Sequence, residues 1–313
     1  MRRKISVIGA GKTGATTAQR LAERNYADIV LFDVVEGLAE GEALDLLQSG
    51  PIIGFDSKVT GVTVKDGAGF EQLAGSDIVV MTAGIARKPG MSRDDLVITN
   101  QKIMHSWAEA IKQHAPDTIL IVLSNPVDAI TQYAWHVTQF PRERVIGQAG
   151  VLDSARFRTF LAMELGVSVQ NVDAYVLGAH GDSMVPLPNY TTSAGIPVTE
   201  LIAPERLAQI VQRTRDGGAE IVKLLKTGSA FYAPSAAIAE MVDAIMYDKK
   251  KIIPCTVLLQ GEYGMRNVFA GVPVQLGARG AEKVVEWKLN AEEQAGLAKS
   301  VAAVQELLKV MGI

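Results

Sequence analysis

Histidine is the side chain best suited to exchange a proton near neutral pH, because its unperturbed pKa lies close to that range. The chain has four histidines. His105, His114 and His136 lie in helical patterns without any accompanying signal, and we interpret them as ordinary helix histidines. His180 differs, because it follows an apolar run and stands between glycines in the segment GAHGDS. We therefore select His180 as the candidate for acid–base chemistry.

A glycine-rich turn near the N-terminus predicts a nucleotide site. It has the spacing G-x-G-x-x-G, follows a predicted strand and opens a predicted helix, which is the context that gives this motif meaning. The first glycine allows a tight turn, the second lets the backbone approach a pyrophosphate, and the third lets helix and strand pack closely. Free N–H groups at the helix N-terminus would then face the phosphates. The residues of the turn are Gly9, Ala10, Gly11, Lys12, Thr13 and Gly14.

Asp33 ends the next predicted strand, where an acidic residue accepts hydrogen bonds from the adenosine ribose. Its carboxylate would repel a 2′-phosphate, so the sequence favours NAD over NADP. The alternative is that Asp33 is a helix cap or turn residue. Lys12 either adds positive charge near the pyrophosphate or points into solvent, and we favour the second interpretation. The spacing of this turn is not that of a P-loop.

Four further segments make the assignment much more specific. With the glycine turn, they resemble the L-lactate/L-malate dehydrogenase family over nearly the whole chain, and most closely its lactate-dehydrogenase-like bacterial malate dehydrogenases. The segments are TAGIARKPGMSR at 82–93, SNPVD at 124–128, QAGVLDSAR at 148–156 and GAHGDS at 178–183. The resemblance implies a doubly wound Rossmann domain, a following mixed α/β catalytic domain, and hydride transfer between NAD and a 2-hydroxy acid.

The resemblance also implies roles for single residues. His180 matches the family's proton donor and acceptor. Asp153 matches the carboxylate that orients this histidine and stabilises its charged form, although the residue alone would be interpreted as a helix N-cap. Asp182 is the rival partner, but neighbours in sequence rarely aim their side chains at each other. Arg156, three residues after Asp153 on the same helical face, matches the clamp for the substrate's 1-carboxylate.

Four more residues are carried over from the resemblance. Arg93 matches the arginine that stabilises negative charge on the carbonyl oxygen, in a loop that closes over the substrate. Asn125 matches a residue that contacts both substrate and nicotinamide, although asparagine before proline is also an ordinary turn former. Asn100 is expected near the cofactor, where the backbone of Leu123 or, alternatively, Val122 makes further contacts.

Arg87 decides the expected substrate. In the resembled family this position is glutamine in lactate dehydrogenases and arginine in malate dehydrogenases. A guanidinium pairs with the second carboxylate of oxaloacetate, whereas pyruvate would leave that charge unpaired in a closed site. The alternative is that Lys88 faces the site and Arg87 faces solvent. Ala86 replaces the proline that many of these malate dehydrogenases have. The rival functions are a lactate dehydrogenase, a non-catalytic dinucleotide-binding redox sensor, and a structural protein.

Alternating strand and helix patterns in the first half predict a parallel sheet covered by helices on both faces. We expect residues 1–147 to form the NAD-binding domain and residues 148–313 the substrate-binding domain. The predicted strands are 4–8, 28–32, 59–64, 77–81, 118–123, 172–179, 252–260 and 268–276. The predicted helices are 14–24, 35–47, 92–114, 153–166, 204–226, 235–246 and 291–310.

Composition narrows the class of protein. The chain has 313 residues, 48% of them hydrophobic, which is enough for two domains with sizeable cores. A formal net charge of −3 does not suit a nucleic-acid binder. We expect no signal peptide and no membrane span, because no apolar stretch is long enough. Cys255 is the one cysteine and reads as a small buried residue, which fits a cytoplasmic protein. The resemblance implies a homo-oligomer, either dimer or tetramer.

Overall fold

The protein is described by a computed structural model that covers residues 2–85 and 93–313, without the side chain of Arg93. Its centre is a nine-stranded sheet in the order β14-β13-β12-β6-β5-β4-β1-β2-β3. The six strands from β3 to β6 run parallel in the doubly wound nucleotide-binding order, which confirms the expected fold class. These strands are β1 (Arg3–Ile8), β2 (Ala27–Asp33), β3 (Val59–Thr63), β4 (Ile78–Met81), β5 (Ile119–Val122) and β6 (Val145–Gly147).

Three antiparallel strands from the second half of the chain extend this sheet. They are β12 (Lys251–Gln260), β13 (Arg266–Gly277) and β14 (Gly280–Val284). The junction is the pairing of β12 with β6, where Thr256 lies opposite Gly147. The sheet therefore continues across the predicted division at residue 147.

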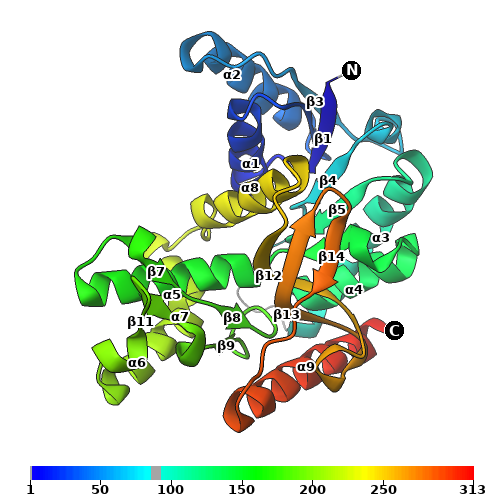
Figure 1. Cartoon of the computed structure of the whole chain (residues 1–313). Helices are drawn as coiled ribbons and strands as arrows, with labels where there is room; N and C mark the ends of the chain where they lie inside the picture. The colour runs from blue at the N-terminus through cyan, green and yellow to red at the C-terminus, as the bar shows by residue number, and fades with distance from the viewer. Residues whose placement is uncertain (1, 86–92) are drawn as a thin grey trace.

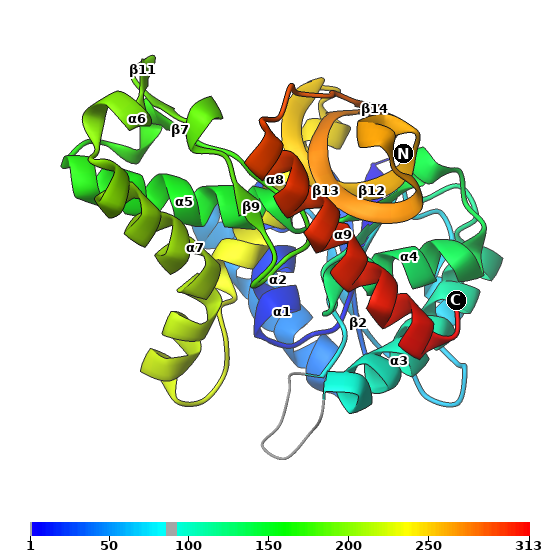
Figure 2. The ribbon, with the colours of Figure 1, turned by 90° about the horizontal axis from the view of Figure 1, so that it is seen from below.

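Helices cover both faces of the sheet (Figure 1). One layer contains α1 (Lys12–Glu23), α2 (Leu38–Ile53) and α8 (Tyr232–Met246). The other contains α3 (Arg93–His114), α4 (Val127–Thr138) and α9 (Ala291–Met311). Figure 2 shows α9, the last helix, lying across α3 and α4. The last helix thus covers a face that the first half of the chain builds.

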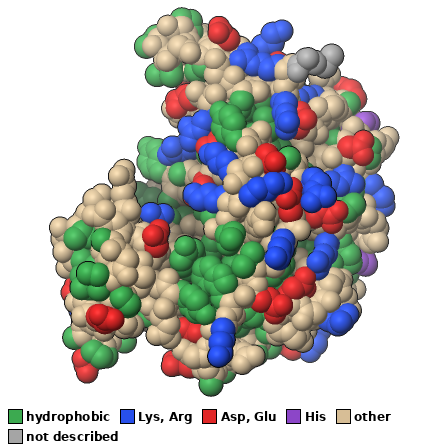
Figure 3. Space-filling model, viewed as in Figure 1, with side chains coloured by type: hydrophobic (Ala, Val, Ile, Leu, Met, Phe, Trp, Pro, Cys, Tyr) green, Lys and Arg blue, Asp and Glu red, His purple; other side chains and the backbone are tan. Residues whose placement is uncertain are grey.

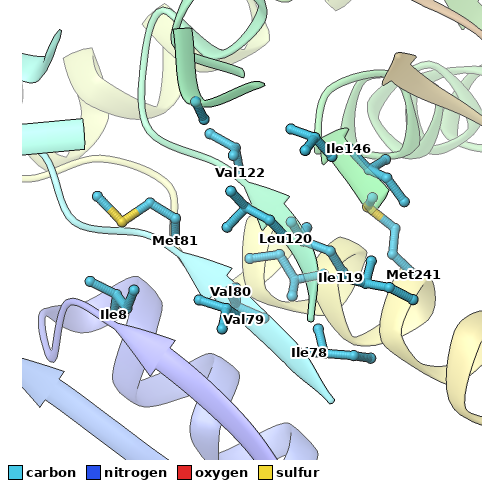
Figure 4. Packing of buried hydrophobic residues seen from close by; sticks show 14 of the residues in the cluster. Ile8, Ile78, Val79, Val80, Met81, Ile119, Leu120, Val122, Ile146 and Met241 are labelled. Atoms are coloured by element: carbon cyan, nitrogen blue, oxygen red, sulfur yellow. The ribbon is translucent and has the colours of Figure 1, made fainter. Parts of the chain in front are cut away.

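The parallel strands are apolar on both faces because helices cover both. Figure 4 shows Ile8, Val80, Leu120 and Ile146 from four of these strands, with Met241 of α8 packed nearby. Cys255 belongs to the same core, and burial raises the pKa of its thiol well above the ordinary range. This confirms the interpretation of Cys255 as a small buried residue.

A smaller lobe beside the sheet has its own core, which includes Phe157, Leu161 and Ile210. Its helices are α5 (Gly150–Leu165), α6 (Val198–Leu201) and α7 (Pro204–Leu225). Its strands are β7 (Val172–Asp173), β10 (Thr192–Ser193) and β11 (Ile196–Pro197). The pair β8 (Val176–Leu177) and β9 (Val185–Pro186) connects the lobe to the sheet, since it packs on β13 and α9. The long helix α5 connects this lobe to the sheet, because it also packs on β12 and α8.

The predicted strand 172–179 is wrong. The chain changes partners after Asp173, so that β7 pairs with β10 and β8 pairs with β9. At the start of β8, the Val176 N–H donates to the hydroxyl of Ser154 in α5 at 2.9 Å. Among the described helices and strands, seven lie outside the predicted set: α4, α6, β6, β9, β10, β11 and β14. In α4 the buried Thr131 and Thr138 bond their own helix carbonyls, so polar residues interrupt the apolar pattern.

In the part of the chain that the structure describes, no helix is both long enough and apolar enough to cross a membrane.

Candidate active site

The glycine turn is built as its spacing predicts. Gly9 leaves β1 with φ +99°, a conformation that glycine adopts without strain, and its N–H donates to Phe32 O at 2.8 Å. A Cβ at Gly14 would overlap the carbonyl of Gly9, so the helix approaches the strand closely only with glycine there. A Cβ at Gly11 would meet nothing within 4 Å, and Gly11 stands at the N-cap of α1. The helix N-terminus is therefore open to an anion.

Asp33 lies beside this turn at the end of β2. One carboxylate oxygen accepts from Ala10 N at 2.7 Å, and the other accepts from Val35 N at 2.9 Å. It is thus a turn residue as well as a partner of the glycine turn, but it does not cap α2, whose N-cap is Gly37. The carboxylate is held where the first two parallel strands end.

Lys12 is exposed at the start of α1, with Nζ 5.5 Å from the centre of the Phe231 ring. Its neighbour Thr13 is half-buried. The ammonium group therefore lies over an aromatic face instead of pointing freely into solvent.

A second group of residues lies at the start of α5. Asp153 is buried in the first turn of this helix, and one of its carboxylate oxygens lies 2.9 Å from His180 Nδ1. The other oxygen lies 3.2 Å from an amino nitrogen of Arg156, one helical turn further on. Gly150 lets the start of α5 lie close to β12, because a Cβ at this position would overlap Pro254. The three predicted residues therefore meet, although His180 is 27 positions from Asp153.

The rival interpretations of Asp153 and Asp182 do not hold. The N-cap of α5 is Ala149, so Asp153 lies inside the helix and aims its side chain at the histidine. Asp182 instead lines a separate cavity of about 1020 Å³ with residues of α7 and α9.

The surroundings of His180 favour its charged form. Burial lowers the pKa of the imidazole, but the charge of Asp153 and its hydrogen bond outweigh burial and hold that pKa above the ordinary value. Because Asp153 accepts from Nδ1, the Nδ1 atom carries the proton and Nε2 is left to face a substrate. The ring is one-fifth exposed, with 22% of its side-chain surface accessible.

Arg156 retains hydrogen-bonding capacity in a buried position. Its side chain is 12% exposed, and among the described residues its Nε has no hydrogen-bond partner. Gly217 and Gly218 of α7 leave room for the side chain, since a Cβ at Gly217 would lie 3.2 Å from Arg156 Cδ. A buried guanidinium with an unused N–H is a suitable donor for a carboxylate.

Asn100 ties two turns of the nucleotide-binding half together. Its side chain accepts from Ile85 N at 2.8 Å and donates to Asn125 O at 2.7 Å. Leu123 N donates to Met81 O at 2.9 Å, which extends the pairing of β5 with β4 beyond the strands. Asn125 itself is exposed at the edge where these strands end.

Two predicted residues are not placed. Arg87 lies in segment 86–92, outside the described residues, and so does the side chain of Arg93. Arg93 is the residue at which α3 begins.

The predicted nucleotide-binding residues lie where the parallel strands β1, β2 and β5 end. In doubly wound sheets ligands bind at this edge, at the point where the strand order reverses. A family model described as the NAD binding domain of lactate/malate dehydrogenase matches residues 3–147. A second, described as the alpha/beta C-terminal domain of lactate/malate dehydrogenase, matches residues 150–311. The chain belongs to the lactate/malate dehydrogenase family.

Both malate dehydrogenases and lactate dehydrogenases are similar to the chain. The malate dehydrogenase of Thermomicrobium roseum is 52% identical over 311 residues, which cover 99% of each chain. The structure of the malate dehydrogenase from Picrophilus torridus is 48% identical, with a TM-score of 0.96 over 99% of this chain and 97% of that one. A lactate dehydrogenase from Cryptosporidium parvum, complexed with lactic acid and NAD, is 38% identical, with a TM-score of 0.95 over 100% and 98%.

Membership makes the protein an NAD-dependent oxidoreductase. The described residues fit the cofactor, because Gly11 leaves the start of α1 open and Asp33 stands at the end of β2. Gln148 has a buried amide nitrogen that a bound ligand would satisfy. Its side chain is 3% exposed, and its Nε2 has no hydrogen-bond partner among the described residues.

Asp128, in the segment SNPVD, is a further residue at this site that was not predicted from the sequence. Asp128 is buried in the first turn of α4, and its carboxylate accepts from the backbone N–H of His180 at 2.9 Å. The signal available in the sequence was an acidic residue inside the otherwise apolar run 126–130.

Proposed function

We propose that the chain is an NAD-dependent malate dehydrogenase, which interconverts (S)-malate and oxaloacetate. The observation that carries the reaction type is the buried group of Asp153, His180 and Arg156. In this group an imidazole that could exchange a proton and a guanidinium that could bind a carboxylate contact the same aspartate, which supports the proposal. The choice of malate is supported by relatives named malate dehydrogenase and by Arg87 in the sequence.

In malate oxidation, His180 takes the hydroxyl proton at Nε2. Asp153 keeps the other ring proton at Nδ1 and stabilises the imidazolium that forms. The bound nicotinamide supplies the chemistry of hydride acceptance. Because the imidazolium forms next to a buried carboxylate, the proton transfer creates no isolated charge.

Three arginines complete the proposed substrate site. Arg156 holds the 1-carboxylate, Arg87 the second carboxylate, and Arg93 stabilises negative charge on the reacting oxygen. For the cofactor, the turn from Gly9 to Gly14, including Ala10, Gly11, Lys12 and Thr13, holds the pyrophosphate, and Asp33 holds the adenosine ribose. The remaining proposed cofactor contacts are Asn100, Leu123 and Asn125, of which Asn125 also contacts the substrate.

Lactate dehydrogenase is the second candidate, because a solved relative that binds lactic acid has the same fold. The test compares kcat/KM for oxaloacetate and pyruvate, with NADH, in the parent and in Arg87→Gln. We expect the parent to prefer oxaloacetate by about a thousandfold and the variant to lose that preference, because an unpaired charge in a closed site costs several kcal/mol. Equal or better pyruvate reduction by the parent would contradict the malate assignment. No NADH binding at all would exclude both dehydrogenases.

We also propose that the protein is a cytoplasmic homo-oligomer. Exposed hydrophobic side chains gather at the outer end of α2, at the top of Figure 3. They include Ile52 and Ile53, which are 85% and 58% exposed, and an apolar patch of this kind favours association. The lone cysteine is consistent with a reducing compartment. Sedimentation analysis would give the oligomeric state.

A further inference from the structure

Asp128 is a buried carboxylate that the reaction proposed above does not use. It lies in the first turn of α4, three residues after Asn125, and is only 4% exposed. An aspartate near a helix start ordinarily binds the free N–H groups of its own helix or faces solvent. The carboxylate of Asp128 instead binds groups from the other half of the chain.

Both of its oxygens have partners. One accepts from the backbone N–H of His180 at 2.9 Å, and the other accepts from the hydroxyl of Thr256 at 2.6 Å. Thr256 is fully buried on β12, at the position that pairs with Gly147 of β6. Asp128 therefore joins three segments: the start of α4, the strand that extends the sheet, and the turn that carries the histidine.

His180 is consequently held at two points. Asp153 binds its imidazole and Asp128 binds its backbone. Burying a second carboxylate is costly, and a well-packed apolar residue would fill the same space at a lower cost. We infer that Asp128 is a positioning residue: from the nucleotide-binding half, its carboxylate fixes the backbone of His180 and places a second negative charge beside the imidazole. The inference rests on the proton-exchanging role proposed for His180.

The position of Asp128 links the cofactor and the histidine. The segment that contains it begins at Asn125, whose carbonyl accepts from Asn100 at 2.7 Å. Asn100 also holds Ile85, in the turn after β4. The two turns proposed to meet the nicotinamide are thus hydrogen-bonded to each other, and the short segment from Asn125 to Asp128 joins them to the anchor of the histidine. Loss of Asp128 would release the backbone of His180 but leave the bonds of Asn100 in place, so it should lower kcat far more than it raises the KM for NADH.

The charged groups facing His180 from the described elements are few. Asp153 and Arg156 face it from α5, and Asp128 faces it from α4. Burial and Arg156 lower the pKa of the imidazole, whereas Asp153 and Asp128 raise it. Burial raises the pKa of the Asp128 carboxyl, against the hydrogen bonds from Thr256 and His180 that lower it, so its charge acts on the imidazole above that pKa. In that range, removing the charge of Asp128 while keeping its shape should shift the titration of His180 to lower pH.

The test uses Asp128→Asn, which keeps an oxygen acceptor for His180 N but removes the charge, and Asp128→Ala, which removes both. Asp243→Asn is the matched control, because Asp243 is another buried carboxylate with hydrogen-bond partners, Arg24 and Tyr26, away from His180. The imidazole is titrated by NMR in full-length protein labelled with ¹⁵N-histidine, and His180→Asn identifies its signal. Turnover is measured with whichever 2-oxo acid the parent reduces fastest.

We expect Asp128→Asn to move the His180 titration to lower pH by about 0.5 to 1 pH unit and to keep kcat within about tenfold. Asp128→Ala should lower kcat by about a hundredfold and change the KM for NADH by less than about threefold. Asp243→Asn should lower only the thermal midpoint. An unchanged His180 titration in Asp128→Asn would overturn the inference, even if Asp128→Ala fails to fold. Since the titration needs no substrate, this outcome is separate from a failure of the malate assignment.

Discussion

The glycine turn after β1 is made by the backbone, whereas the group around His180 is made by buried side chains. In the turn, the decisive contact is the approach of Gly14 to the carbonyl of Gly9, which leaves no room for a Cβ. Around His180, the decisive contacts are charged groups at 2.9 and 3.2 Å. The first region depends on shape and the second on charge. Substitutions in the two regions should therefore fail in different ways.

The largest effect is expected from His180→Asn. It removes the group that exchanges the proton, and general acid–base catalysis contributes about 10² to 10⁴ in rate. We expect kcat for oxaloacetate reduction to fall by about a thousandfold, while NADH binding, followed by fluorescence, changes by less than about threefold. A comparable loss of NADH binding would show that the two regions are not separate.

A smaller effect, on NADH affinity instead of turnover, is expected from Gly14→Ala. The added Cβ overlaps the carbonyl of Gly9, so α1 must move away from β1. We expect the Kd for NADH to rise by about a hundredfold, because the phosphates then lose the helix N-terminus. The control is Gly41→Ala in α2, where a Cβ meets nothing within 4 Å. That control should keep NADH affinity and raise stability by about 0.5 to 1 kcal/mol. Equal Kd values in the two variants would contradict a steric role for Gly14.

The smallest effect is a dependence on pH, which only the charged region should show. Reduction needs the imidazolium of His180, whose pKa lies above its ordinary value of 6.5. The kcat/KM for oxaloacetate should therefore be constant at low pH and fall about tenfold per pH unit once the pH exceeds that pKa. Malate oxidation needs the neutral ring, so its kcat/KM should rise over the same range.

The control for this pH profile is Asp153→Asn, which removes the charge that raises the pKa of His180. Its profile should shift to lower pH. A midpoint below pH 6.5 in the parent would mean that burial outweighs Asp153. NADH binding to the glycine turn should stay nearly constant through the titration.

The sequence predicted the backbone-built region well, because local spacing determines it. The spacing of Gly9, Gly11 and Gly14 specifies strand, turn and helix, and all three were found. The pairing of Asp153 with His180 is not local. Spacing left Asp182 as a rival, and the correct partner was favoured by the resemblance to a family and by the poor geometry of a contact between near neighbours in sequence.

What the sequence did not predict depends on tertiary contacts. The strand expected at 172–179 is broken because its two ends pair with different strands, β7 with β10 and β8 with β9, and the Val176 N–H binds Ser154 of α5. Asp128 was overlooked because a first-turn aspartate is common, and nothing nearby shows that its partners lie 52 and 128 positions away. Only the folded chain brings these groups together.

The pairing of Thr256 with Gly147 also affects whether the two halves of the chain could fold separately. Two family models divide the chain near residue 148, yet β12 continues the sheet beyond that point, and α8 and α9 cover faces built by the first half. A fragment ending at residue 147 would have a bare sheet edge at β6 and would lose the part of each face that α8 and α9 cover, which is a template for aggregation. Recombination at this apparent boundary would therefore transfer a nucleotide-binding motif without a self-sufficient folding unit.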